Sequence, residues 1–167
     1  MFGSFLNVCI ARLPKHLSIV TPRSYCPVCS EPIRALDNIP VASWIWLKRK
    51  CRQCHTRISI QYPLIELGTA VLFVACLIET GFSWETLINA VACFFLLGLA
   101  VMDAQTMILP DTFTLTGLVV AFVLKVCEPG IGLGLEQRAR IAFRTIEDAA
   151  LAAGMLLLVW AVYWVMR

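Results

Sequence analysis

Residues 62–103 read YPLIELGTAVLFVACLIETGFSWETLINAVACFFLLGLAVMD, and this stretch decides the fold. It holds two mostly apolar runs, residues 62–78 and 84–102, which are separated by a short turn that contains Gly81. Each run approaches the roughly 20 residues that an α-helix needs to cross a bilayer. Backbone groups in lipid must be hydrogen-bonded internally, which a helix achieves by itself. The stretch therefore predicts a transmembrane helical hairpin.

Two later apolar runs, residues 113–126 and 149–166, extend the pattern toward the end of the chain. The composition agrees, because 59% of the 167 residues are hydrophobic and only 15% are charged, against about 25% charged in soluble domains. The apolar residues before Arg12 are too few to cross a bilayer and resemble the second half of a helix. We expect an all-α polytopic membrane protein: the remnant of a first transmembrane helix in residues 1–13, then about four spans in residues 62–167.

Basic residues are concentrated in the segment between these parts. Nine of the fourteen Lys and Arg residues lie between Arg12 and Arg57. Loops rich in Lys and Arg remain in the cytoplasm, so we place residues 14–61 there. Counting spans then places residues 128–148 outside, with 135–146 as a candidate interfacial helix. The basic residues do not alternate with aromatic ones, so nothing favours a nucleic-acid partner.

The same loop carries four cysteines in two CxxC pairs, Cys26-Pro-Val-Cys29 and Cys51-Arg-Gln-Cys54. Two residues between thiolates allow one tight turn to aim both sulfurs at one ion, and two such turns complete a tetrahedral site. The spacing predicts a small zinc-ribbon-like loop in which Cys26, Cys29, Cys51 and Cys54 bind a structural Zn²⁺. Two buried or disulfide-bonded pairs are the alternative. His55 directly follows Cys54, and we expect it to be exposed and not a fifth ligand.

Two aspartates stand at the end of the second run, in the stretch Asp103-Ala-Gln-Thr-Met-Ile-Leu-Pro-Asp111. A carboxylate at a membrane edge is a candidate functional group, because burying its charge is costly. Asp103 is thus either catalytic or a charge that marks the membrane surface. Asp111 follows Pro110 and suits the amino end of the next helix.

Several stretches together resemble the prepilin peptidase family, in the order and spacing that this family uses. They are the two CxxC pairs, residues 103–111, Gly3-Ser4-Phe5-Leu6-Asn7-Val8 with Arg12-Leu13-Pro14, Asp37-Asn38-Ile39-Pro40-Val41-Ala42-Ser43-Trp44, and Ile58-Ser59-Ile60-Gln61-Tyr62-Pro63-Leu64-Ile65-Glu66-Leu67. The resemblance implies a multi-pass aspartyl peptidase of the bacterial inner membrane. Such an enzyme cleaves the basic leader of type IV prepilins or type II secretion pseudopilins, then methylates the new amino terminus with S-adenosylmethionine.

By this resemblance Asp103 is the first catalytic aspartate, with Asp111 as a possible supporting residue. The second aspartate of the family is the last residue of a Gly-x-Gly-Asp motif, which these 167 residues do not contain. We therefore expect a chain truncated relative to the family, lacking its carboxy-terminal part and inactive by itself. A dyad of Asp103 with Glu66 is a weaker alternative. The alternative function is a non-catalytic membrane zinc module that binds pilin leaders or another membrane subunit.

Overall fold

The computed structural model describes the backbone of residues 1–128 and 134–166, and their side chains except at 35, 38, 152, 153 and 155–166. No strand forms in these residues, which confirms the predicted helical class for the described chain. The α-helices are α1 (Phe2–Arg12), α2 (Ala42–Trp46), α3 (Gln61–Thr80), α4 (Trp84–Thr106), α5 (Asp111–Val126) and α6 (Leu135–Met166). Two 3₁₀ turns, Leu13–Lys15 and Ala35–Asn38, precede α2.

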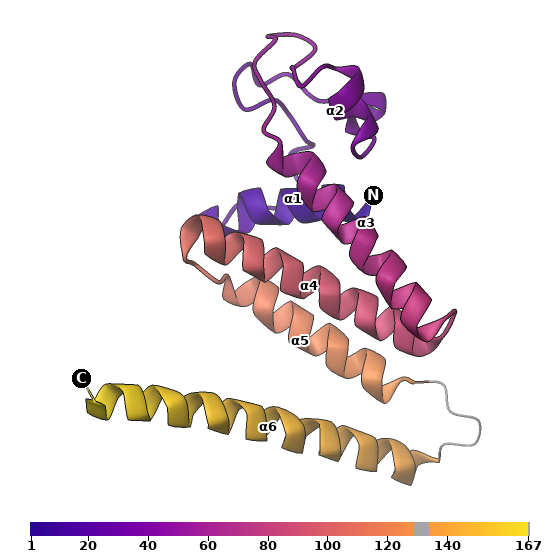
Figure 1. The fold of residues 1–167 in the computed structure, drawn as a ribbon, viewed down its shortest axis with the longest axis vertical. Coiled ribbons are helices and arrows are strands. Elements are labelled where there is room, and N and C mark those ends of the chain that lie inside the picture. The colour runs from indigo at the N-terminus through magenta and orange to yellow at the C-terminus, as the bar shows by residue number, and fades with distance from the viewer. Residues whose placement is uncertain (129–133, 167) are drawn as a thin grey trace. The chain divides into compact units, whose positions relative to one another are not determined.

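Helices α3 and α4 form the predicted hairpin (Figure 1). Helix α3 ends at Gly81, whose φ of 64° suits glycine because it has no Cβ. Ser83 begins α4 by accepting a hydrogen bond from the Thr86 backbone N–H at 3.2 Å. Helix α4 ends where Met107 adopts a left-handed conformation with a φ of 51°. Gly81 and the Ser83 cap therefore define the two ends of the predicted turn between α3 and α4.

Helix α1 packs across both arms of the hairpin (Figure 1). A close approach of the helices is possible because Gly3 in α1 and Gly98 in α4 have no side chain at the contact. A Cβ at Gly3 would lie only 2.6 Å from the Cα of Glu66, and one at Gly98 would lie 2.8 Å from Leu6 Cδ1. The small core that results joins α1, α3, α4 and α5, and consists of Leu6, Cys9, Ile10, Ile65, Met102 and Phe113.

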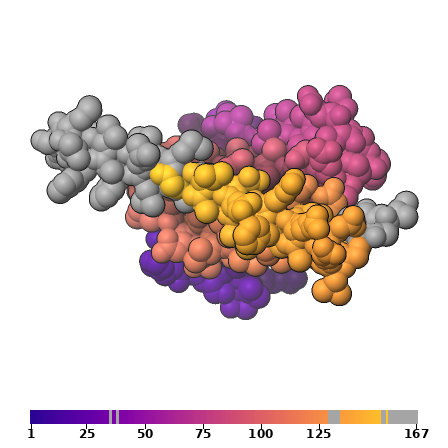
Figure 2. All heavy atoms as spheres, turned by 90° about the horizontal axis from the view of Figure 1, so that it is seen from below, coloured from indigo at the N-terminus to yellow at the C-terminus, as the bar shows by residue number. Residues whose placement is uncertain are grey.

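Helix α3 directs most of its apolar side chains outward, whereas those of α4 are mostly half-buried. Both have the length and composition of a membrane span, with mean hydropathy of 1.7 and 2.1. Only 22% and 11% of their most apolar windows are buried, whereas a core helix of a soluble protein would be mostly buried. The side chains of α3 form a continuous outer surface in the space-filling view (magenta, Figure 2). Two of the four expected spans therefore have the character of membrane helices.

The chain divides after Gly117 into two compact units. The second unit contains the end of α5 and all of α6. Residues 135–146 and 149–166, which we treated as an interfacial helix and a separate span, form one continuous helix. The reason is that neither Gly nor Pro lies between these two segments to interrupt the helix. Helix α5 has 16 residues, so its role as a span stays a prediction. Residues 129–133 of the expected outer loop lie outside the described residues.

Candidate metal centre

The two CxxC pairs lie in two turns of matching geometry. In the first turn, the Cys26 N–H donates to the Glu31 carbonyl at 2.9 Å, and the Ser30 N–H donates to the Cys26 carbonyl at 2.8 Å. In the second turn, the Cys51 N–H donates to the Thr56 carbonyl at 2.8 Å, and the His55 N–H donates to the Cys51 carbonyl at 3.1 Å. The same pattern, offset by 25 residues, thus holds each pair of sulfurs.

The residue after each second cysteine has the same unusual backbone conformation. Ser30 has a φ of 59° and His55 a φ of 55°. Such values are uncommon for residues with a side chain, and here they close the two turns. His55 is exposed and lies outside the cluster of candidate ligand atoms found among the described residues. Its conformation closes the turn, and that it is not a ligand stays a prediction.

The two turns bring all four sulfurs to one point. The Sγ atoms of Cys26, Cys29, Cys51 and Cys54 lie within 4.8 Å of one another, and Cys26 Sγ lies 3.7 Å from Cys54 Sγ. In a tetrahedral site with Zn–S bonds of about 2.3 Å, neighbouring sulfurs lie about 3.8 Å apart. All four are free thiols, so the disulfide alternative is not what the structure shows. The donor set and its spacing therefore fit a closed tetrathiolate site.

The ionisation of these thiols depends on close hydrogen bonds. The Thr56 hydroxyl, 3.3 Å from Cys54 Sγ, and the Thr56 N–H lower the pKa of Cys54 to about 6. Backbone N–H groups of Cys29 and Val28 lower the pKa of Cys26. For Cys29, the Glu31 N–H favours the thiolate, but desolvation and the other sulfurs outweigh it and raise the pKa to about 11. Four ionised thiols at this spacing need a cation between them.

Around the cluster, an ion pair braces the second turn against the 3₁₀ turn at Ala35–Asn38. The Arg52 guanidinium binds Asp37 through two hydrogen bonds, of 2.8 and 2.6 Å. This contact holds the pKa of Asp37 below its usual value. The side chain of Asp37 is 10% exposed and that of Arg52 is 47% exposed. Arg52 therefore connects the turn that carries Cys51 and Cys54 to the preceding part of the loop.

Three hydrogen bonds hold the loop and the helices beside it: one joins the loop to α3, one lies within the loop, and one joins α1 to α3. Glu66 Oε2, in α3, accepts from the Val41 N–H at 2.7 Å, and Trp44 Nε1 donates to the Ile58 carbonyl at 3.4 Å. At the base of the loop, Asn7 Nδ2 donates to the Tyr62 carbonyl at 3.1 Å. Glu66 thus has a structural partner in the loop, which accounts for a carboxylate near the start of an apolar helix.

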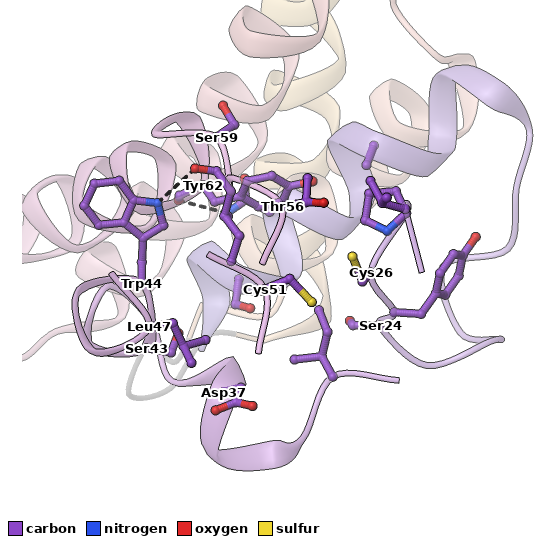
Figure 3. Close-up of a pocket in the computed structure, with 18 of the residues that line it drawn as sticks. Ser24, Cys26, Asp37, Ser43, Trp44, Leu47, Cys51, Thr56, Ser59 and Tyr62 are labelled. Atoms are coloured by element: carbon purple, nitrogen blue, oxygen red, sulfur yellow. Dashed lines mark hydrogen bonds between the residues drawn. The ribbon is translucent and has the colours of Figure 1, made fainter. Parts of the chain in front are cut away.

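A cavity of about 610 Å³ lies between the loop, α1 and the first turns of α3 (Figure 3). Trp44, Tyr62 and Cys51 are among the labelled residues around it in the close-up. Its lining also includes Asn7 and Arg12 from α1. Because the cavity contacts both the cysteine turns and the helix ends, a molecule bound there would lie close to the membrane edge that we propose for α3.

The two candidate aspartates belong to different helices. Asp103 is exposed in the last turn of α4, directly after the buried Met102. Asp111 is the first residue of α5, where its charge favours the amino end of the helix. Residues 107–110 separate α4 from α5, with Pro110 directly before Asp111. Glu66 accepts a hydrogen bond from the Val41 N–H, and its dyad with Asp103 stays a prediction.

Sequence reasoning missed the positioning contacts of Asn7 and Thr56. Asn7 is 6% exposed and shares the buried face of α1 with Gly3, Leu6 and Ile10. These positions follow the i, i+3, i+4, i+7 spacing of a helix, which could have identified Asn7 as a buried polar residue. Thr56 had no such signal, because its contact with Cys54 depends on how the turn closes.

The structure thus shows an apolar helical hairpin whose α3 arm faces outward, beside a loop in which four closely spaced thiols could hold a metal ion. These features are typical of a helical, membrane-compatible protein. A family profile described as the Bacterial Peptidase A24 N-terminal domain matches residues 1–80. The Prepilin leader peptidase/N-methyltransferase of Klebsiella pneumoniae is 37% identical over 99% of this chain and 70% of its own length. The chain belongs to this family of prepilin leader peptidases.

Two further relatives with the same name give the same result. The protein of Aeromonas hydrophila is 36% identical over the whole chain, which spans 62% of that relative. The protein of Myxococcus xanthus is 44% identical over 73% of the chain and 36% of its own length. The chain thus spans less than two thirds of these two relatives. No solved structure matches the chain.

Proposed function

We propose that the chain contributes Asp103 and the cysteine loop to a prepilin leader peptidase and N-methyltransferase of a type IV pilus or type II secretion system. Its substrates are type IV prepilins or pseudopilins, and its place is the bacterial inner membrane with the cysteine loop in the cytoplasm. The observation that carries this proposal is the 37% identity over 99% of the chain to a relative of that name. The apolar lengths of α3 and α4 and the outward apolar face of α3 support the membrane location.

In the peptidase reaction, we assign Asp103 as one of two carboxylates that act on a water molecule and on the leaving amide. Its position at the end of α4 supports this role, because peptide cleavage needs water and Asp103 is exposed. Glu66, the other candidate carboxylate among the described residues, accepts a hydrogen bond from Val41. The described residues therefore offer no supported second carboxylate for Asp103. We expect residues 1–167 expressed by themselves not to cleave a prepilin.

The test uses the full-length protein encoded by the gene, in cells that lack their own prepilin peptidase. Asp103→Asn should abolish leader removal, measured by mass spectrometry of the pilin, and protein levels should not change. Glu85→Gln is the matched control, since Glu85 is an exposed carboxylate in the first turn of the same helix and should affect cleavage little. Normal leader removal by the Asp103→Asn variant would reject the catalytic role.

In the cysteine loop, we propose one structural zinc ion held by Cys26, Cys29, Cys51 and Cys54. Four protein ligands leave no open coordination position, so the ion would hold the loop together and would not activate water. The matching turns and the sulfur distances support this assignment. The loop then positions Asp37 and Trp44 around the cavity.

S-adenosylmethionine is the methyl donor that the methyltransferase name of the relatives suggests. It would supply the methyl group for the new amino terminus of the pilin. We propose that it binds in the 610 Å³ cavity, where Trp44 and Tyr62 offer aromatic surface and Arg12 a positive charge. In the full-length enzyme, Cys51→Ser should disturb this cavity, so that methylation is lost while cleavage continues. Unchanged methylation would exclude the loop from methyl transfer.

A non-catalytic zinc module is the second candidate, favoured by the completeness of the four-thiol cluster. This function requires the loop but not the carboxylate. If Asp103→Ala leaves pilus assembly or secretion intact while Cys26→Ser abolishes it, the module explains the protein better than the peptidase does.

A further inference from the structure

Helix α2 exposes two large apolar side chains next to three cations. Ile45 is 64% exposed and Trp46 is 80% exposed. Lys48, Arg49 and Lys50 follow directly and are all exposed. None of the ion pairs found in the described chain includes these three cations. Apolar and basic groups thus share one surface, which we call the α2 surface (residues 45–50).

Hydrogen bonds fix the α2 surface beside the first turns of α3. The Val41 N–H, directly before α2, donates to Glu66 Oε2 at 2.7 Å. Glu66 lies five residues after the first residue of α3, which is about 8 Å along the helix axis. The Ile58 N–H also donates to the Arg49 carbonyl at 2.7 Å. The surface therefore lies at the level where α3, as we place it, enters the membrane.

The backbone around α2 is held in an uncommon conformation. Val41, Lys48 and Arg49 have φ values of 58°, 48° and 65°. Positive φ is rare for residues other than glycine, and for a β-branched residue such as Val41 it is a strained conformation. Strain of this kind persists where the surrounding structure imposes it, often for function. Here it directs the chain after α2 so that the cations remain exposed.

We propose that the α2 surface binds anionic phospholipid headgroups of the cytoplasmic leaflet. Tryptophan is favoured at the bilayer interface, and Lys or Arg next to the membrane is attracted to anionic lipid. Charge complementarity selects this partner, because the basic leader of a prepilin would be repelled by three cations. The inference rests on the proposed membrane placement of α3 and adds a lipid contact outside the spans.

The test uses the full-length protein in nanodiscs of phosphatidylglycerol with brominated acyl chains, which quench nearby tryptophan fluorescence. The wild-type signal minus that of Trp46→Phe reports on Trp46. Trp44→Phe is the matched control, because Trp44 lies two residues earlier, is half-buried, and has Arg49 over its ring at 5.1 Å. We expect a bromolipid-quenched component that Trp46→Phe removes and Trp44→Phe retains.

A second variant tests the role of charge. Replacing Lys48, Arg49 and Lys50 with Gln should remove the stronger Trp46 quenching in phosphatidylglycerol compared with phosphatidylcholine. Trp46 quenched by aqueous acrylamide and not by brominated lipid would overturn the proposal. If Trp46 escapes quenching, the tryptophans that remain in Trp46→Phe show which proposal has failed. If brominated lipid does not quench them either, the membrane placement fails. If it does quench them, only the lipid contact of the α2 surface fails.

Discussion

Replacement of Gly3 by alanine tests how α1 is positioned against α3. The new Cβ would lie 2.6 Å from the Cα of Glu66 and 3.3 Å from its carbonyl oxygen. Both are backbone atoms, so no side-chain rotation relieves the contact. Helix α1 must move away by about 1 Å to restore ordinary van der Waals separation of about 3.5 Å or more.

The cost follows from what this movement disturbs. Overpacking costs about 1–3 kcal/mol, and weakening the 3.1 Å hydrogen bond from Asn7 to the Tyr62 carbonyl adds about 1 kcal/mol. The higher helix propensity of alanine offsets at most about 1 kcal/mol. Gly3→Ala should therefore destabilise the protein by about 1–3 kcal/mol. The loop should also loosen, because Glu66, whose backbone the new Cβ would meet, accepts a hydrogen bond from Val41 in the loop.

Thermal unfolding of the detergent-solubilised protein, followed by differential scanning fluorimetry, measures this effect. Gly68→Ala is the matched control, because the nearest atom to its new Cβ is Leu97 Cδ2 at an ordinary distance of 3.9 Å. It should be neutral or stabilising by up to about 1 kcal/mol. Equal unfolding temperatures for the two variants would refute the close helix contact.

Three further predictions concern the loop. His55→Gly should keep the metal and gain up to about 1 kcal/mol in stability, because His55 has a φ of 55°; metal loss would instead make His55 a ligand. Glu66→Gln should weaken the hydrogen bond from the Val41 N–H by about 1 kcal/mol, so hydrogen exchange of the Val41 amide should accelerate. An unchanged exchange rate at Val41 would contradict the contact. A double-mutant cycle of Asp37→Ala and Arg52→Ala should give coupling of at most about 1 kcal/mol, since Arg52 is 47% exposed; a much larger value would show a buried pair.

Sequence alone predicted the features that depend on local pattern. The lengths of the apolar runs and the turn at Gly81 determine the hairpin, and the CxxC spacing brings Cys26 and Cys51 into one cluster. Pro110 likewise stands directly before Asp111, the first residue of α5. In each case the controlling interaction lies within a few residues or follows from coordination geometry.

Contacts between distant segments were not predictable in the same way. The hydrogen bond between Glu66 and Val41 joins residues 25 positions apart, and it depends on the loop folding back over α3. The Arg52 guanidinium likewise pairs with Asp37, which lies 15 positions earlier in the chain. Tertiary partners decided the roles of these charged residues, and neither helical periodicity nor motif spacing specifies such partners.

Metal content of the purified full-length protein tests most directly whether the four sulfurs form one zinc site. Mass spectrometry of the metal should find one zinc ion per chain, lost in Cys26→Ser and in Cys51→Ser. Cys127→Ser is the control, because Cys127 is exposed and lies outside the cluster; it should retain the zinc. A wild-type protein without zinc, or full zinc retention in Cys26→Ser and Cys51→Ser, would contradict the assignment.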